Sequence, residues 1–207
     1  MERVRLSSLA ARFTGICLCV SLAACADPRV KAAGELEAEM AARHARRARS
    51  EDLLAQAAKA VERSDLSAAR RCLDESLAAD AQNAHAWMAL GALEFGQDDI
   101  CGAAQSFHRA ARLEPMRYEP RYNLGIVLES VGKHSEAAKE YEIALERAPD
   151  QVEVMENLAC CYVRTNTNGD KVRPLVEKAL RQEHRPEWVR WLQEQACRLD
   201  QQKEKTP

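Results

Sequence analysis

Residues 87–115 read WMALGALEFGQDDICGAAQSFHRAARLEP, and residues 121–149 read RYNLGIVLESVGKHSEAAKEYEIALERAP. The second stretch repeats the first at an offset of 34 residues, from 87 to 121. Both contain a Leu-Gly pair, a pair of alanines, an aromatic residue, a further alanine and a closing proline. The matching positions are Leu90 and Leu124, Gly91 and Gly125, Ala104 and Ala138, Phe107 and Tyr141, Ala110 and Ala144, and Pro115 and Pro149. A period of this length indicates stacked supersecondary units.

The period extends beyond these two stretches in weaker form. Leu158-Ala159 follows Leu124-Gly125 by one period, and residues 152–186 keep a helical stripe of apolar residues after a longer turn. Pro174 is expected in the first turn of the second helix of that unit, where proline is tolerated. Residues 50–83 keep the apolar spacing but lack the Leu-Gly pair and the closing proline.

These residues resemble the tetratricopeptide repeat, in which each unit is a helix-turn-helix. The resemblance implies an all-α fold, an α-α superhelix of about four repeats followed by a C-terminal capping helix. A small residue at Gly91, Gly125 and Ala159 would let the paired helix approach closely, and one unit alone could not bury its apolar face. The expected segments are a divergent repeat at 50–83, repeats at 84–117 and 118–151, a divergent repeat at 152–186, a capping helix at 187–199 and a tail at 200–207.

Composition agrees with a helical protein. The chain has 207 residues, of which 46% are hydrophobic and 30% charged, with only 8 glycines and 7 prolines. The formal net charge is −2, which argues against a nucleic-acid partner.

The first 24 residues have the pattern of an export signal. Arg3, Arg5 and Arg12 precede an apolar stretch over 13–24 that is too short to span a bilayer. The stretch ends in Leu22-Ala23-Ala24-Cys25, which resembles the lipobox of bacterial lipoproteins. An ordinary signal peptide with a chance cysteine is the alternative.

The lipobox resemblance implies cleavage before Cys25 and lipidation of its sulfur, so that acyl chains anchor the protein to a membrane. We therefore expect a bacterial envelope protein that is lipid-anchored and faces the periplasm. Ala26 favours the outer membrane over the inner membrane. Residues 25–49 are rich in Ala, Glu and Arg, and we interpret them as a charged helical tether.

In the tetratricopeptide-repeat family the first helix of each unit lines a concave groove. Carried onto this sequence, the resemblance assigns nine residues to a partner-binding surface, called here the predicted groove. They are Met88, Ala92, Phe95, Tyr122, Ile126, Glu129, Glu156, Cys160 and Val163. Packing between helices is the alternative role for Met88, Ile126 and Cys160. Asn123 and Asn157 are present, but no basic residues accompany them at the matching positions, so no carboxylate clamp is expected.

We find no motif for catalysis, for a cofactor or for a metal. HExxH, GxSxG, CxxC and a phosphate-binding glycine loop are all missing, and the histidines are isolated. After removal of the signal and lipidation of Cys25, five cysteines remain: Cys72, Cys101, Cys160, Cys161 and Cys197. An odd number leaves a free thiol or an intermolecular bridge, and a Cys72–Cys101 bridge is conceivable.

The leading hypothesis is a non-enzymatic, membrane-anchored adaptor that binds a protein or peptide in envelope assembly or a related complex. A self-associating solenoid scaffold is the first alternative, because solenoids with apolar ends stack on one another. The second is a lipoprotein similar to the pilotins of pilus or secretion systems, which are also lipoproteins built of such repeats.

Overall fold

The computed structural model describes residues 28–166, 169–183 and 185–204. The signal segment and Cys25 lie outside these ranges. All regular secondary structure in the described residues is helical. The helices are α1 (Pro28–Glu62), α2 (Leu66–Ala79), α3 (Ala84–Gly96), α4 (Ile100–Leu113), α5 (Glu119–Ser130), α6 (His134–Arg147), α7 (Val152–Arg164), α8 (Gly169–Gln182) and α9 (Pro186–Glu204). The expected all-α class is confirmed.

The chain divides into two compact units, residues 1–46 and 47–207. In the first unit, the described part of α1 is solvent-exposed over residues 31–46. α1 has no break near residue 50, so one helix contains both the expected tether and the first helix of the first repeat.

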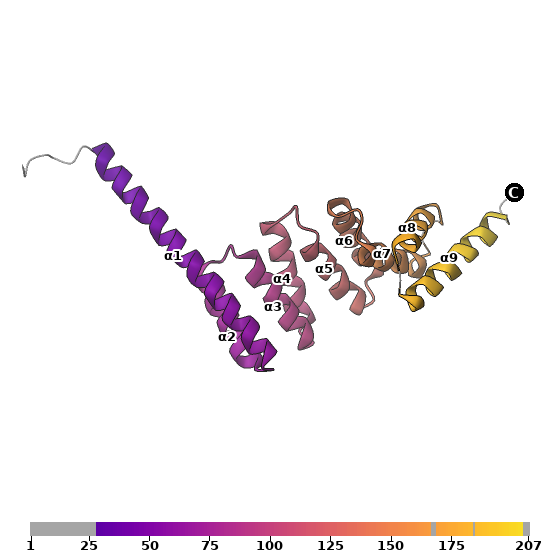
Figure 1. The fold of residues 1–207 in the computed structure, drawn as a ribbon, viewed down its shortest axis with the longest axis horizontal. Coiled ribbons are helices and arrows are strands. Elements are labelled where there is room, and N and C mark those ends of the chain that lie inside the picture. The colour runs from indigo at the N-terminus through magenta and orange to yellow at the C-terminus, as the bar shows by residue number, and fades with distance from the viewer. Residues whose placement is uncertain (1–27, 167–168, 184, 205–207) are drawn as a thin grey trace, which may run out of the picture. The chain divides into compact units, whose positions relative to one another are not determined.

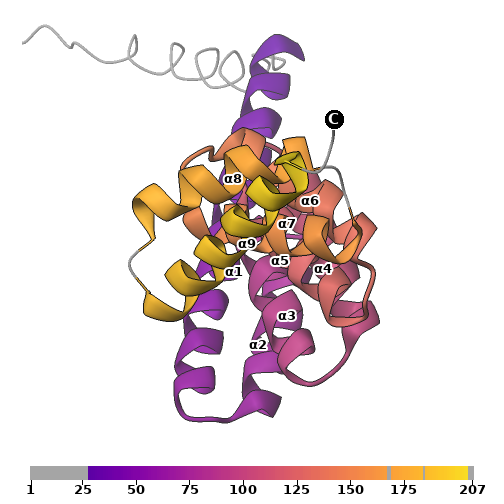
Figure 2. The ribbon, with the colours of Figure 1, turned by 90° about the vertical axis from the view of Figure 1, so that its right-hand side faces the viewer.

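Within residues 47–207, each helix from α2 onward contacts the next helix in the chain. Figure 1 shows the pairs α3–α4, α5–α6 and α7–α8 succeeding one another in chain order, and Figure 2 looks along them with α8 and α9 nearest the viewer. This is the nearest-neighbour stacking of a repeat protein.

Glycine and aromatic residues meet inside the two central repeats. An added Cβ on Gly91 would lie 2.9 Å from Cδ1 of Phe107, and one on Gly125 would lie 2.4 Å from Cε1 of Tyr141. Both rings are buried. The residue after leucine in each Leu-Gly pair is therefore glycine, because the aromatic ring of the paired helix occupies the space that a side chain would need.

A hydrogen-bond network around two buried serines joins α1 and α2 to the residue that begins α3. The Ser76 hydroxyl donates to the carbonyl oxygen of Ser50 at 2.7 Å, and the two hydroxyl oxygens lie 2.8 Å apart. The side-chain amide of Asn83 donates to Ser50 Oγ at 2.9 Å. Asn83 also caps α3, because its side-chain oxygen accepts from the backbone N–H of Ala86.

The C-terminal end is closed by α9. Leu192 is fully buried, and Trp191, Ala196 and Leu199 pack against the same core cluster as α6, α7 and α8. Pro174 differs from expectation: α8 begins at Gly169, so the proline is its sixth residue and lies inside the helix rather than in the first turn. None of the helices in the described ranges combines the length and hydrophobicity that a membrane crossing requires.

Candidate partner-binding surface

The predicted groove residues all lie on first helices of repeats, namely on α3, α5 and α7. Ala92 and Val163 are exposed, and Glu156 is buried. The other six are half-buried: Met88, Phe95, Tyr122, Ile126, Glu129 and Cys160. The core clusters contact four of these side chains, which keep part of their surface exposed: Met88, Phe95, Tyr122 and Ile126.

Asparagines connect successive first helices along this surface. The side-chain amide of Asn157 donates to the Tyr122 hydroxyl at 3.3 Å, and that of Asn123 lies 3.9 Å from the Met88 sulfur. The two contacts span the same sequence separation of 35 residues. Both asparagines therefore orient a predicted groove residue of the preceding repeat.

Glu129 is held at the edge of the surface by Tyr141. The Tyr141 hydroxyl donates to Oε2 of Glu129 at 3.0 Å, and the rings of Tyr122 and Tyr141 lie 5.8 Å apart between centroids. Burial, reinforced by the neighbouring Glu129 charge, raises the pKa of Tyr141 above its ordinary value. Tyr141 therefore remains a hydrogen-bond donor at neutral pH.

Glu156 requires a correction, because it does not present a free carboxylate to a partner. Only 1% of the residue is exposed, and Oε2 accepts from Nη2 of Arg185 at 2.6 Å. The same Nη2 donates to Oε2 of Glu183 at 2.5 Å. Burial, together with the hydrogen bond to Glu183, raises the pKa of Glu156 to about 8, although Arg185 opposes the shift.

Arg185 was not singled out from the sequence. It lies 29 residues beyond Glu156, just before α9, and no motif marks that spacing. Its guanidinium bonds to both carboxylates, and those contacts raise its pKa further. The charge of Arg185 is thus committed to Glu156 and Glu183.

A cleft lies between α2, α3 and α4, and none of the predicted groove residues lines it. The cleft has a volume of about 580 Å³. The residues lining it include Arg70, Trp87, Glu94, Ser106 and Arg109. Glu94 is buried but satisfied, because Arg70 lies 3.2 Å away and the Ser106 hydroxyl donates at 2.6 Å. This carboxylate therefore joins α2, α3 and α4 and needs no outside partner.

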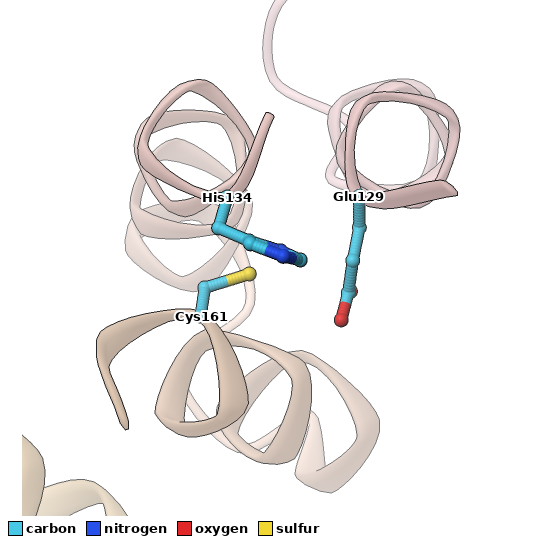
Figure 3. Close-up of side chains that lie close together, drawn as sticks. All are labelled: Glu129, His134 and Cys161. Atoms are coloured by element: carbon cyan, nitrogen blue, oxygen red, sulfur yellow. The ribbon is translucent and has the colours of Figure 1, made fainter. Parts of the chain in front are cut away.

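No sequence motif links Glu129, His134 and Cys161, yet the fold brings them together (Figure 3). One carboxylate oxygen, one ring nitrogen and the sulfur all lie within 4.8 Å of one another. They come from α5, α6 and α7. Cys72, Cys101, Cys160 and Cys161 form no disulfide, and burial raises the pKa of Cys160 and of Cys161 to about 12.

A sequence profile of the tetratricopeptide repeat matches residues 54–116, 93–152 and 122–183, which together exceed half of the chain. The chain belongs to the tetratricopeptide-repeat family. Members of this family are typically non-catalytic scaffolds for protein interaction, and they bind proteins or peptides.

Solved structures agree with this fold. MamA superposes with a TM-score of 0.58 at 24% identity, covering 64% of this chain and 72% of MamA. A mutant of Thermobaculum terrenum O-GlcNAc transferase superposes with a TM-score of 0.57 at 26% identity, and the match covers 65% of this chain and 26% of the transferase. YrrB, a TPR protein with an unusual peptide-binding site, superposes with a TM-score of 0.54 at 19% identity, and the match covers 63% of this chain and 67% of YrrB.

Among characterised proteins, Superkiller complex protein 3 of Homo sapiens is 24% identical over 91 residues. The match covers 44% of this chain but 6% of that protein, so the chain spans only a small part of its relative's length.

Proposed function

We propose that this protein is a lipid-anchored adaptor, facing the periplasm from the outer membrane, that binds a polypeptide along the predicted groove. The observation that carries the proposal is the row of partly exposed side chains on α3, α5 and α7. Met88, Tyr122 and Ile126 each contact the core on one side and reach the surface on the other. Flexible methionine and aromatic side chains suit a peptide or helix of varied shape.

The character of this surface favours an apolar or amphipathic segment over a charged one. Glu129 and Glu156 are engaged by Tyr141 and Arg185. The exposed Ala92 and Val163 add small apolar contacts at its edges. A helix laying an apolar face on the row would bury these side chains without leaving a charge unpaired.

The lipobox at Leu22-Ala23-Ala24-Cys25 supports the anchor. The exposed helix that follows supports a tether, since residues 28–46 at the α-helical rise of 1.5 Å per residue extend about 28 Å. Such a spacer would let the repeats work at a distance from the bilayer surface. A pilotin-like role is compatible with this proposal, since it would also hold a protein from a lipid anchor.

A self-associating scaffold would need an apolar end surface. In the described part of α9 up to residue 199, no large apolar side chain is exposed. Trp188 and Val189 are half-buried, and the guanidinium of Arg185 lies 5.8 Å from the Trp188 ring centroid. This end therefore gives no support to stacking, and the adaptor is the better-supported function.

The test is capture of the partner from native envelopes, followed by mass spectrometry, with two matched valine variants. Val163→Glu places a charge on the predicted groove, and Val131→Glu places one at the α5–α6 turn. Both side chains are exposed, by 38% and 50%, so neither change disturbs the core. We expect Val163→Glu to lose a protein that the wild type and Val131→Glu retain. Equal recovery of every captured protein by the two variants would contradict binding at this surface.

A further inference from the structure

The cluster of Glu129, His134 and Cys161 stands where two repeats meet. Glu129 and His134 flank the α5–α6 turn of the repeat at 118–151, and Cys161 belongs to α7 of the next repeat. Cys161 is fully buried, whereas Glu129 and His134 are half-buried. The cluster is therefore enclosed on the side of Cys161 and reaches toward solvent through the other two residues.

An unsatisfied polar atom lies within this cluster. Nδ1 of His134 is buried and has no hydrogen-bond partner among the described residues. Buried polar groups in folded proteins are normally paired, because an unpaired one loses its bonds to water and gains nothing. Figure 3 shows the imidazole directed into the space between Glu129 and Cys161. The cluster therefore includes a histidine with a buried, unpaired ring nitrogen that a ligand would satisfy.

The three donor types specify the class of ligand. Ca²⁺ and Mg²⁺ are held almost wholly by oxygen atoms, whereas thiolate with imidazole is the donor set of zinc and similar borderline metals. Sites with three protein ligands leave a fourth position for water. The cluster offers sulfur, nitrogen and oxygen once each, which suits a tetrahedral zinc ion with one water.

The spacing fits such an ion after small movements of the side chains. Zinc bonds of 2.0–2.3 Å in tetrahedral geometry place ligand atoms about 3.5 Å apart. The atoms here lie within 4.8 Å of one another before any ion is added. Tyr141 bonds only Oε2 of Glu129, which leaves Oε1 for an ion. A hydrogen bond of this kind orients a ligating carboxylate.

We propose that Glu129, His134 and Cys161 bind one zinc ion, with water as the fourth ligand. On binding, the Cys161 thiol gives its proton to solvent and the thiolate coordinates the metal. Because the ligands belong to two repeats, the ion joins the repeat at 118–151 to the one that follows. The site does not depend on the proposed adaptor function.

The test uses the full-length chain, purified in detergent, reduced, and stripped of metal with a chelator. Zn²⁺ is titrated against a chromophoric chelator, and Co²⁺ is added separately because a cobalt–thiolate bond gives a charge-transfer band. Cys161→Ser and His134→Asn remove ligands. Cys160→Ser changes the adjacent, half-buried cysteine, and His108→Asn changes an exposed histidine. Circular dichroism checks that each variant is folded.

We expect the wild type and both controls to bind one equivalent of zinc and to show the cobalt–thiolate band. Zinc in excess of its dissociation constant should raise the thermal midpoint by about 5–10 °C. Cys161→Ser and His134→Asn should each lose the band and most of the affinity. The proposal is overturned if the wild type binds neither metal near one equivalent, or if folded His134→Asn binds both as the wild type does.

Discussion

At Gly91 and Gly125 a missing side chain makes room for an aromatic ring on the paired helix. Because Phe107 and Tyr141 are buried, neither ring has free space into which it can move. We expect Gly125→Ala to lower the free energy of unfolding by about 1–3 kcal/mol, and Gly91→Ala to lower it less, since its Cβ would meet the ring at 2.9 Å rather than 2.4 Å.

The matched control is Gly96→Ala at the end of α3. A Cβ there would meet nothing within 4 Å, and Gly96 does not have a positive φ. This change should be neutral or should stabilise the protein by up to about 1 kcal/mol through the lower entropy of the unfolded chain. Urea denaturation followed by circular dichroism measures all three. Equal effects at positions 96 and 125 would refute the close-packing explanation.

Glu156 should make stability depend on pH. Its pKa is about 8 in the folded protein and ordinarily 4.5, so between these values the folded state binds more protons than the unfolded chain. The free energy of unfolding therefore falls as pH rises through this interval. We expect Glu156→Gln to reduce this decrease of the free energy of unfolding with pH. Glu153→Gln, which changes an exposed residue of α7, should leave the decrease as it is in the wild type. Urea denaturation at several pH values measures this pH dependence. If the free energy of unfolding of Glu156→Gln changed with pH as steeply as that of the wild type, Glu156 would not be the source of the dependence.

Helix starts differ along the chain. Asp99 caps α4, because Oδ1 accepts from the backbone N–H of Gly102 at 2.9 Å. Gln151 stands before α7 in an extended conformation but makes no side-chain capping bond. We expect Asp99→Ala to cost about 1 kcal/mol and Gln151→Ser to gain about 0.5–1 kcal/mol. Denaturant midpoints measure both changes in stability. A loss of stability in Gln151→Ser would show that a serine at position 151 cannot cap α7.

The 34-residue period was sufficient to predict the helical pairs, because each matched position has a packing role that recurs in every unit. Leu90-Gly91 and Phe107 are such positions, and the all-α fold and the repeat family are both confirmed. The continuity of α1 through residue 50 was not predicted, since composition changes there but no glycine or proline ends the helix.

Contacts between repeats were harder to predict than contacts within them. Glu156 meets Arg185 only because the segment before α9 returns toward α7. The cluster around Cys161 depends on how three helices are rotated relative to one another. Neither arrangement has a local sequence spacing, so the sequence alone assigned Glu156 to the surface and the three candidate ligands to separate roles.

At the scale of the whole molecule, the proposed membrane attachment depends on the sulfur of Cys25. Cys25→Ser should abolish incorporation of a fatty-acid label and release the protein from the membrane fraction, because lipid transfer requires the thiol. Cys72→Ser is the control, since it changes a cysteine within the repeats. Labelling with an alkyne-tagged fatty acid measures the outcome. Full labelling of Cys25→Ser would remove the lipoprotein interpretation.

The central claim is that a polypeptide binds along the first helices of the repeats. Its most direct test is photo-crosslinking in the native envelope, with p-benzoylphenylalanine placed at Ala92 of α3 or at Ala78 of α2. Both alanines are exposed, but only Ala92 belongs to the predicted groove. We predict an adduct with a second protein at position 92 and none at position 78. An adduct only at position 78, or adducts only between copies of this chain, would contradict the account.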